Sequence, residues 1–155
     1  MPLLRAALSW NFVLATAICA SLLAQLIKVL LNLFIFHRFI AERMWGAGGM
    51  PSSHSATVCA MVVATGRYCG VNSPLFAIAA VLSIIVMYDA MGVRYETGEQ
   101  AKVLNRMFTE WMDQGFEQFQ LPHGKKLKEM VGHTPIEVVT GAALGIVLGF
   151  AMPIV

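Results

Sequence analysis

The chain has 155 residues, of which 57% are hydrophobic and 13% are charged, and its formal net charge is +2. A soluble domain typically has about a quarter of its residues charged and less than half apolar. The composition therefore excludes a disordered chain, a coiled coil and an ordinary water-soluble domain, and the small net charge argues against a nucleic-acid partner. We expect a single integral membrane domain over residues 1–155.

Four apolar segments predict the fold class, which is an all-α, integral membrane helical bundle with about four transmembrane helices. They cover residues 10–36, 52–69, 74–92 and 134–155. At about 1.5 Å per residue, the first segment is longer than the ~30 Å hydrocarbon core, so it can span with tilt. The rival interpretation is a cleaved secretory signal, which the length of the apolar run disfavours.

Small residues recur at every fourth position in two of these segments. They are Ala56, Ala60 and Ala64 in the second segment, and Gly141, Gly145 and Gly149 in the fourth. Residues four apart lie on one helix face, and small side chains let two membrane helices approach closely. We expect both faces to pack against neighbouring helices. Faces of this kind can also pair two copies of the chain, so a homodimer is a further expectation.

A polar insertion at residues 94–132 separates the third and fourth spans. Of the twenty Asp, Glu, Lys and Arg residues in the chain, eleven lie between Glu96 and Glu129. Apolar residues recur here at helical spacing with charges between them, which predicts an interfacial amphipathic helix along the membrane surface or over the bundle. Two interpretations stay open for it: a solvated lid without chemistry, and an element that recognises lipid headgroups.

Basic residues are concentrated in the two long loops, 36–51 and 94–132, which fall on one side of the membrane if there are four spans. These loops hold eight Lys and Arg residues, against Arg5 and Arg67 on the other side. The positive-inside rule then places the long loops, and any active site that they form, on the cytoplasmic side.

Polar residues form a stripe on the first segment, because Ser21, Gln25, Lys28 and Asn32 are spaced by four, three and four residues. An ionisable residue inside a span costs roughly 3 kcal/mol or more and is a functional candidate by default. We expect the stripe to face the bundle interior, with Lys28 as a functional cation. The alternative is that Lys28 extends along the helix to the nearer membrane surface.

The fourth segment begins with a histidine and a carboxylate one helical turn apart, His133 and Glu137. Their face continues through the three glycines, so we expect both side chains to point inward. A carboxylate at this spacing can accept the imidazole N–H, fix its tautomer and raise its basicity. A purely structural pair would have the same spacing, and that alternative stays open at this point.

The stretch before the second span has the features of an anion-binding helix N-terminus. Pro51 and Ser52 mark its first turn and cap, and Ser53 adds a second hydroxyl. Backbone N–H groups and the helix dipole favour negative charge at such a terminus. His54 would lie at the edge of this site.

A guanidinium joins the same side, since Arg94 follows the third span directly. Asp89 either holds Arg94 in place or is a structural acid at the helix end. Together with Lys28, the serines and the two histidines, Arg94 predicts an oxyanion pocket at the membrane surface. No carboxylate cluster or Cys/His spacing predicts a metal site, and no cofactor is expected.

These residues resemble the membrane-bound type 2 phosphatidic acid phosphatase and vanadium haloperoxidase superfamily, and more narrowly its small divergent branch, over nearly the whole chain. Five segments carry the resemblance: Ala24–Lys28, Gly48–Ser55, Tyr88–Arg94, Gln100–Asn105 and Gly132–Val138. One Pro-Ser-x-His stretch alone would be weak, whereas all five in this order are a specific signal.

The resemblance implies a role for each matched residue. Lys28 matches the lysine that opens the first motif. Ser52 and His54 match a Pro-Ser-Gly-His motif, which supplies phosphate donors and a general acid. His133 matches the nucleophilic histidine, and Glu137 stands where the superfamily has an aspartate, four residues later.

The chain departs from the superfamily pattern at several positions. Ser53 replaces the motif glycine, and no Arg-Pro follows the first lysine, so Arg43 is a distant candidate for the missing arginine. The arginine of the third motif is matched by Leu127, which leaves Lys128 or Arg94 to supply its charge. Asn105, in the fourth matched segment, is a further candidate for a supporting role.

The resemblance implies metal-independent hydrolysis of a phosphomonoester or diphosphate on a phospholipid or isoprenoid lipid, through a phosphohistidine intermediate. The expected partners are the lipid bilayer and the phosphorylated lipid. The alternative is a non-catalytic membrane protein that binds lipid phosphates or assists assembly. Haloperoxidase chemistry is disfavoured, because it is associated with larger soluble members.

Overall fold

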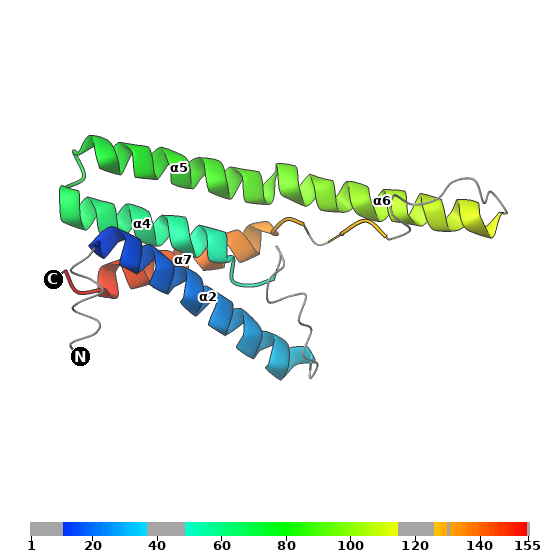
Figure 1. Ribbon diagram of the computed structural model, residues 1–155, viewed down its shortest axis with the longest axis horizontal. Coiled ribbons are helices and arrows are strands. Elements are labelled where there is room, and N and C mark those ends of the chain that lie inside the picture. The colour runs from blue at the N-terminus through cyan, green and yellow to red at the C-terminus, as the bar shows by residue number, and fades with distance from the viewer. Residues whose placement is uncertain (1–10, 37–48, 115–125, 130, 155) are drawn as a thin grey trace.

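The computed structural model describes residues 11–36, 49–114, 126–129 and 131–154, and the described part of the chain is all-helical, with no strand. Its helices are α2 (Phe12–Phe36), α4 (Ser53–Cys69), α5 (Pro74–Met91), α6 (Val93–Asp113) and α7 (Pro135–Ala151) (Figure 1). The predicted all-α fold class is confirmed. The single domain over residues 1–155 stays a prediction.

Helix α4 is the centre of the bundle, since α2, α5 and α7 all pack against it. Helix α2 also contacts α7, whereas the described parts of α2 and α5 do not approach each other closely. In Figure 1, α4 and α7 run in the same direction and α5 runs back beside α4. The starts of α4 and α7 and the end of α5 therefore meet at one end of the bundle.

Helix starts follow the local capping chemistry. The Ser52 hydroxyl accepts the Ser55 backbone N–H at 3.3 Å, and the Ser73 hydroxyl accepts the Phe76 N–H at 3.2 Å. A proline in the first turn follows the caps of α5 and α7, where its missing N–H costs nothing. The predicted starts of the second, third and fourth apolar segments agree with these caps.

The core is built from small residues, and the large apolar side chains point outward. Most buried hydrophobic residues are alanines, and the cluster at the bundle centre consists of Ala20, Ala24, Ala56 and Ala60. By contrast, Leu22, Ile84 and Val147 are 63–65% exposed. A water-soluble protein buries such residues, whereas membrane helices associate through small ones and present large ones to lipid. The chain is a membrane protein on this evidence.

The two predicted small-residue faces pack directly against each other. Gly141, Gly145 and Gly149 are buried along α7, facing the backbone of α4. A Cβ atom on Gly145 would lie 2.2 Å from the Ala56 carbonyl oxygen, and one on Gly141 would lie 2.3 Å from that of Ser52. No side chain fits in this space, so the glycines set how closely α7 approaches α4.

Two helical stretches are long and apolar enough to cross a membrane by length and composition, Phe12–Phe34 and Pro74–Asp113, and Pro135–Ala151 is a shorter apolar helix. The central helix α4 has 17 residues, which is about 25 Å. Of the helices that pack on it, α2 and α5 are longer and α7 has the same length, so α4 can lie in the hydrocarbon core without reaching far beyond it. The number of spans, four, stays a prediction.

Helix α6 continues α5 after the single residue Gly92 and extends beyond the end of the bundle (Figure 1). The amphipathic helix is thus present. Of its two expected positions, the one over the bundle is not adopted, and contact with a membrane surface stays a prediction. One α6 face is covered by residues 126–132, where Asn105 donates to the Leu127 carbonyl at 2.9 Å and accepts the Leu127 N–H at 2.8 Å. This cover holds the segment that leads into α7.

Replacing Gly145 with leucine is expected to separate α7 from α4. Overpacking costs about 1–3 kcal/mol, and here the obstacle is backbone, so the apparent melting temperature in detergent should fall by about 5 °C or more. Ala143→Leu, on an exposed position of the same helix, is the matched control and should leave the melting temperature nearly unchanged. Equal effects of the two substitutions would contradict the packing argument.

Candidate functional site

Three chain segments are fixed to one another at the end of the bundle where the site lies. The Ser52 backbone N–H donates to the Glu137 carbonyl at 2.9 Å, which ties the start of α4 to the first turn of α7. The His133 N–H donates to the Ala90 carbonyl at 3.0 Å, which ties the entry to α7 to the end of α5. The candidate residues therefore lie on a rigid frame.

His133 is the most completely buried of the candidate histidines, at 2% exposure. Its Nδ1 lies 3.1 Å from Oε2 of Glu137, and that oxygen also accepts the Thr134 backbone N–H at 3.0 Å. Because a carboxylate only accepts, Nδ1 carries a proton, and in the neutral form of the ring the lone pair is on Nε2. Nε2 is buried and has no hydrogen-bond partner among the described residues. A buried acceptor of this kind indicates a reacting or ligand-binding atom.

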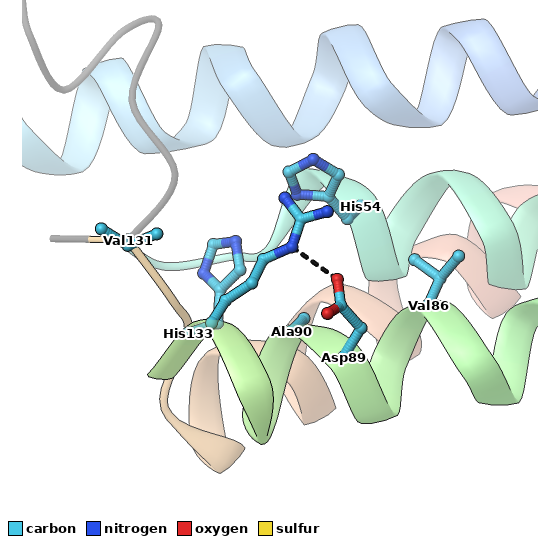
Figure 2. Close-up of a pocket in the computed structure, with 7 residues that line it drawn as sticks. His54, Val86, Asp89, Ala90, Val131 and His133 are labelled. Carbon is cyan, nitrogen blue, oxygen red and sulfur yellow. Dashed lines mark hydrogen bonds and ion pairs between the residues drawn. The ribbon is translucent and has the colours of Figure 1, made fainter. Parts of the chain in front are cut away.

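A cavity of about 150 Å³ lies beside this ring (Figure 2). Its lining is contributed by four segments: His54, Val86, Asp89, Ala90, Arg94, Val131 and His133. The rings of His54 and His133 face it from α4 and from the entry to α7, with centroids 5.8 Å apart and planes at 64°. An engineered cavity of about this volume in another protein holds benzene, so a phosphoryl group fits by size.

An ion pair closes one side of the cavity. The Arg94 Nε–H donates to Oδ2 of Asp89 at 2.5 Å, across the junction between α5 and α6 (Figure 2). Both side chains are partly exposed, at 50% and 37%, and an exposed pair of this kind contributes at most about 1 kcal/mol. Only Nε of the guanidinium is used in this pair, so the remaining N–H groups can meet an anion without breaking it.

Lys28 is enclosed rather than extended to the surface, with only 2% of the residue exposed. The predicted inward orientation is confirmed, and the alternative of extension to the membrane surface is wrong. A Cβ on Gly49, whose φ is +86°, would lie 3.5 Å from Cδ of Lys28. The ammonium interacts electrostatically with Glu137 and with His54. Lys28, on α2, does not line the cavity.

The two serines are buried at the start of α4 and do not line the cavity. The Ser52 hydroxyl is the helix cap and also accepts the Ser55 hydroxyl at 3.1 Å. The Ser53 hydroxyl accepts the Gln25 side-chain amide at 3.5 Å, which ties α4 to the polar stripe of α2. A phosphate-binding role for Ser52 and Ser53 stays a prediction.

The candidate supporting residues have different positions. Asp89 lines the cavity, whereas Asn105 braces the 126–132 segment and also donates to the Glu129 carboxylate at 2.8 Å. Lys128 is exposed and does not line the cavity, and Arg43 lies outside the described residues. Among the described residues, no group of three His, Cys, Asp or Glu side chains is placed to hold a metal ion.

Sequence reasoning missed how the 126–132 segment reaches the site. A Cβ on Gly132 would lie 2.3 Å from the Tyr95 backbone nitrogen, and one on Gly98 would lie 2.5 Å from the Glu129 carbonyl oxygen. These two glycines let the segment lie directly on α6, which brings Val131 to the cavity. The only sequence signal was that Gly132 immediately precedes His133.

Comparison with known proteins identifies a family and a relative. A family model described as the Divergent PAP2 family matches residues 9–148, a range that includes every residue lining the cavity. The Bacillus subtilis (strain 168) protein YuiD, described as an uncharacterized membrane protein, is 39% identical over 144 residues, which cover 89% of this chain and 91% of that protein. No solved structure matches the chain significantly.

Inorganic phosphate or vanadate is expected to bind in the cavity, and Arg94→Gln is expected to weaken that binding by about tenfold or more. A hydrogen bond to a charged group contributes about 1.5–3 kcal/mol, and 1.4 kcal/mol is a factor of ten. Titration calorimetry in detergent measures the affinity. Lys102→Gln, which removes an exposed cation paired with Glu99 outside this cavity, is the control. Equal affinities for all three proteins would contradict the assignment.

Proposed function

The chain belongs to the Divergent PAP2 family, and we propose that it is a metal-independent membrane phosphatase that hydrolyses a phosphomonoester or diphosphate on a lipid through a phosphohistidine. One observation carries the proposal. The buried Nε2 of His133 has no described partner and lies beside a cavity that also holds Arg94 and His54. The membrane location and the family of the chain are shown by the findings above, whereas hydrolysis of a lipid phosphate is our proposal.

The chemistry follows from the orientation of the ring. Nε2 of His133 attacks phosphorus, forming the P–N bond as the bond to the leaving oxygen breaks, and Glu137 stabilises the charge that develops on the ring. His54 donates a proton to the leaving oxygen. A water molecule then gives its proton to His54 and attacks phosphorus, which breaks the P–N bond and releases phosphate.

Positive groups around the cavity stabilise the transferring phosphoryl group. Arg94 can donate directly from the cavity wall, while Lys28, which does not line the cavity, acts through the electric field. The backbone N–H groups and dipole at the start of α4 add to this field. All these charges are fixed before the substrate arrives, which is the condition under which they lower a barrier most.

Four spans and a cytoplasmic site are part of the proposal. The described residues at the site end of the bundle include Arg94, Lys102 and Arg106, and Arg67 is the charged residue of α4 at the other end. Positive charge is retained on the cytoplasmic side of membrane proteins. A lipid phosphate of the inner leaflet would then meet the cavity directly.

A second candidate function is a lipid-phosphate binder without turnover. It is favoured by the position of Ser52 and Ser53, which are engaged in the start of α4 instead of lining the cavity. A binder would keep affinity for phosphate or vanadate and release no phosphate from any lipid. The phosphatase assay below separates the two functions.

His133→Ala is expected to abolish phosphate release from a lipid phosphate in detergent with a chelator present. The nucleophile is lost, so enzyme denatured at alkaline pH, where the P–N bond of a phosphohistidine is stable, should also carry no trapped ³²P, unlike the unmodified enzyme. Thr140→Ala is the control. Thr140 is on the same helix, and its hydroxyl donates to the backbone carbonyl groups of Ile136 and Glu137. Full activity of the His133 variant would exclude this residue as the nucleophile.

His54→Ala is expected to slow hydrolysis of an alkyl phosphate by about 10²-fold or more, while an aryl phosphate with a nitrophenol leaving group is affected far less. An acidic leaving group departs without protonation, so it does not need His54. Steady-state rates on the two substrates, measured side by side with unmodified enzyme, test this. An equal loss on both substrates would show that His54 has another role.

A further inference from the structure

An apolar groove of about 460 Å³ lies between α2 and α5, at the opposite end of the bundle from the cavity. Its floor is α4, through Met61, Thr65 and Tyr68, and its walls include Ala17 of α2 and Leu82 of α5. The Thr65 hydroxyl donates to the Met61 carbonyl at 2.7 Å, so this hydroxyl is paired within α4. The groove exists because α2 and α5 both pack on α4 without approaching each other.

The floor of the groove and the cavity lie along the same face of α4. His54, Met61, Thr65 and Tyr68 are separated by seven, four and three residues, so they lie on one face of the helix. On α5, Leu82 lines the groove and Val86, one turn further on, lines the cavity. The apolar groove and the polar cavity are therefore in line along α4 and α5.

The size of the groove favours a hydrocarbon chain as its occupant. Ligand sites typically measure about 300–1,000 Å³, a range that includes this groove. A single flexible hydrocarbon chain fits a groove of this volume with an apolar lining.

The distance from the cavity to the far end of the groove discriminates between lipid chains more strongly than the volume of the groove does. Along α4, Met61 is about 10 Å from the level of His54, and Tyr68 is about 21 Å away. One leaflet of the ~30 Å hydrocarbon core is about 15 Å deep. A chain that starts at a phosphate beside His54 and fills the groove must therefore pass the bilayer midplane. Ordinary two-chain phospholipids end near that plane.

We propose that this groove binds the single hydrocarbon chain of the substrate, and that it selects a lipid phosphate whose chain is longer than one leaflet, as a polyprenyl chain is. The inference rests on the proposed function for the phosphate end of the substrate. It adds a specificity determinant, on α2, α4 and α5, that is separate from the phosphate-binding residues.

Leu82→Trp tests the groove at the point where it approaches the cavity. Leu82 is 44% exposed, so the larger side chain can be accommodated without disrupting the core, and Ile85→Trp, at a 58% exposed position outside the groove, is the matched control. For a long-chain polyprenyl phosphate, we expect Leu82→Trp to lower kcat/KM at least tenfold. For a short-chain prenyl phosphate it should change less than twofold, and the control should change neither.

Three results of the kinetic comparison would overturn the groove proposal. They are an equal loss on both substrates, no loss on either, and a phosphatidate turnover as efficient as that of the polyprenyl phosphate. Ile78→Trp, another groove position that is 64% exposed, provides a second variant if Leu82→Trp fails to fold.

A binding measurement separates this proposal from the reaction itself. A long-chain polyprenyl phosphonate, which cannot be hydrolysed, should raise the melting temperature of the unmodified protein more than a short-chain phosphonate does. Leu82→Trp should remove that difference. If this dependence of the melting temperature on chain length is observed without turnover of any lipid phosphate, chain binding in the groove is supported and the phosphatase function is excluded. If the two phosphonates act equally on the unmodified protein, the groove proposal falls whether or not there is turnover.

Discussion

The contact between α7 and the backbone of α4 is the constraint on which the rest of the structure depends. Only glycine at positions 141 and 145 allows the two helices to lie as close as they do. At this distance the Ser52 N–H reaches the Glu137 carbonyl, which sets the two helix starts at the same level. That level is where Glu137 holds His133 and where His54 lies in the first turn of α4. Helix packing in the hydrocarbon core thus determines the geometry at its edge.

The buried charged groups at this end of the bundle also interact with one another electrostatically. Lys28 is enclosed by protein, and the charge it interacts with most directly is Glu137, whose carboxylate is already engaged by His133 and Thr134. An isolated buried ion would be costly, and each of these groups makes the other tolerable. The arrangement leaves a cation, a carboxylate and an imidazole in fixed positions where few water molecules can screen them. Such preorganised charge is what phosphoryl transfer requires.

Much of this could be predicted from the sequence, because the signals were local. Helical periodicity gave the amphipathic helix, spacing of four gave the glycine and alanine faces, and the i, i+4 pair gave His133 with Glu137. What could not be predicted depends on contacts between distant segments. Ser52 and Ser53 had the composition of a phosphate site, yet their hydroxyls are used by the start of α4 and by Gln25. No local pattern could show that Asn105 holds the 126–132 segment, or that α6 continues α5 beyond the bundle.

The four faces of α4 bear on how the proposed substrate would reach the site. Ala56 and Ala60 pack against α2 and α7, and Sγ of Cys59 lies 3.8 Å from Oγ of Ser83 on α5. Three faces are thereby covered, and the fourth carries His54 at one end and Tyr68 at the other, both exposed. In a bilayer this uncovered face must be occupied by hydrocarbon, since water is excluded there. An amphiphile can therefore enter along its length with its chain already in place, so that only its phosphate has to leave the interface to reach His133.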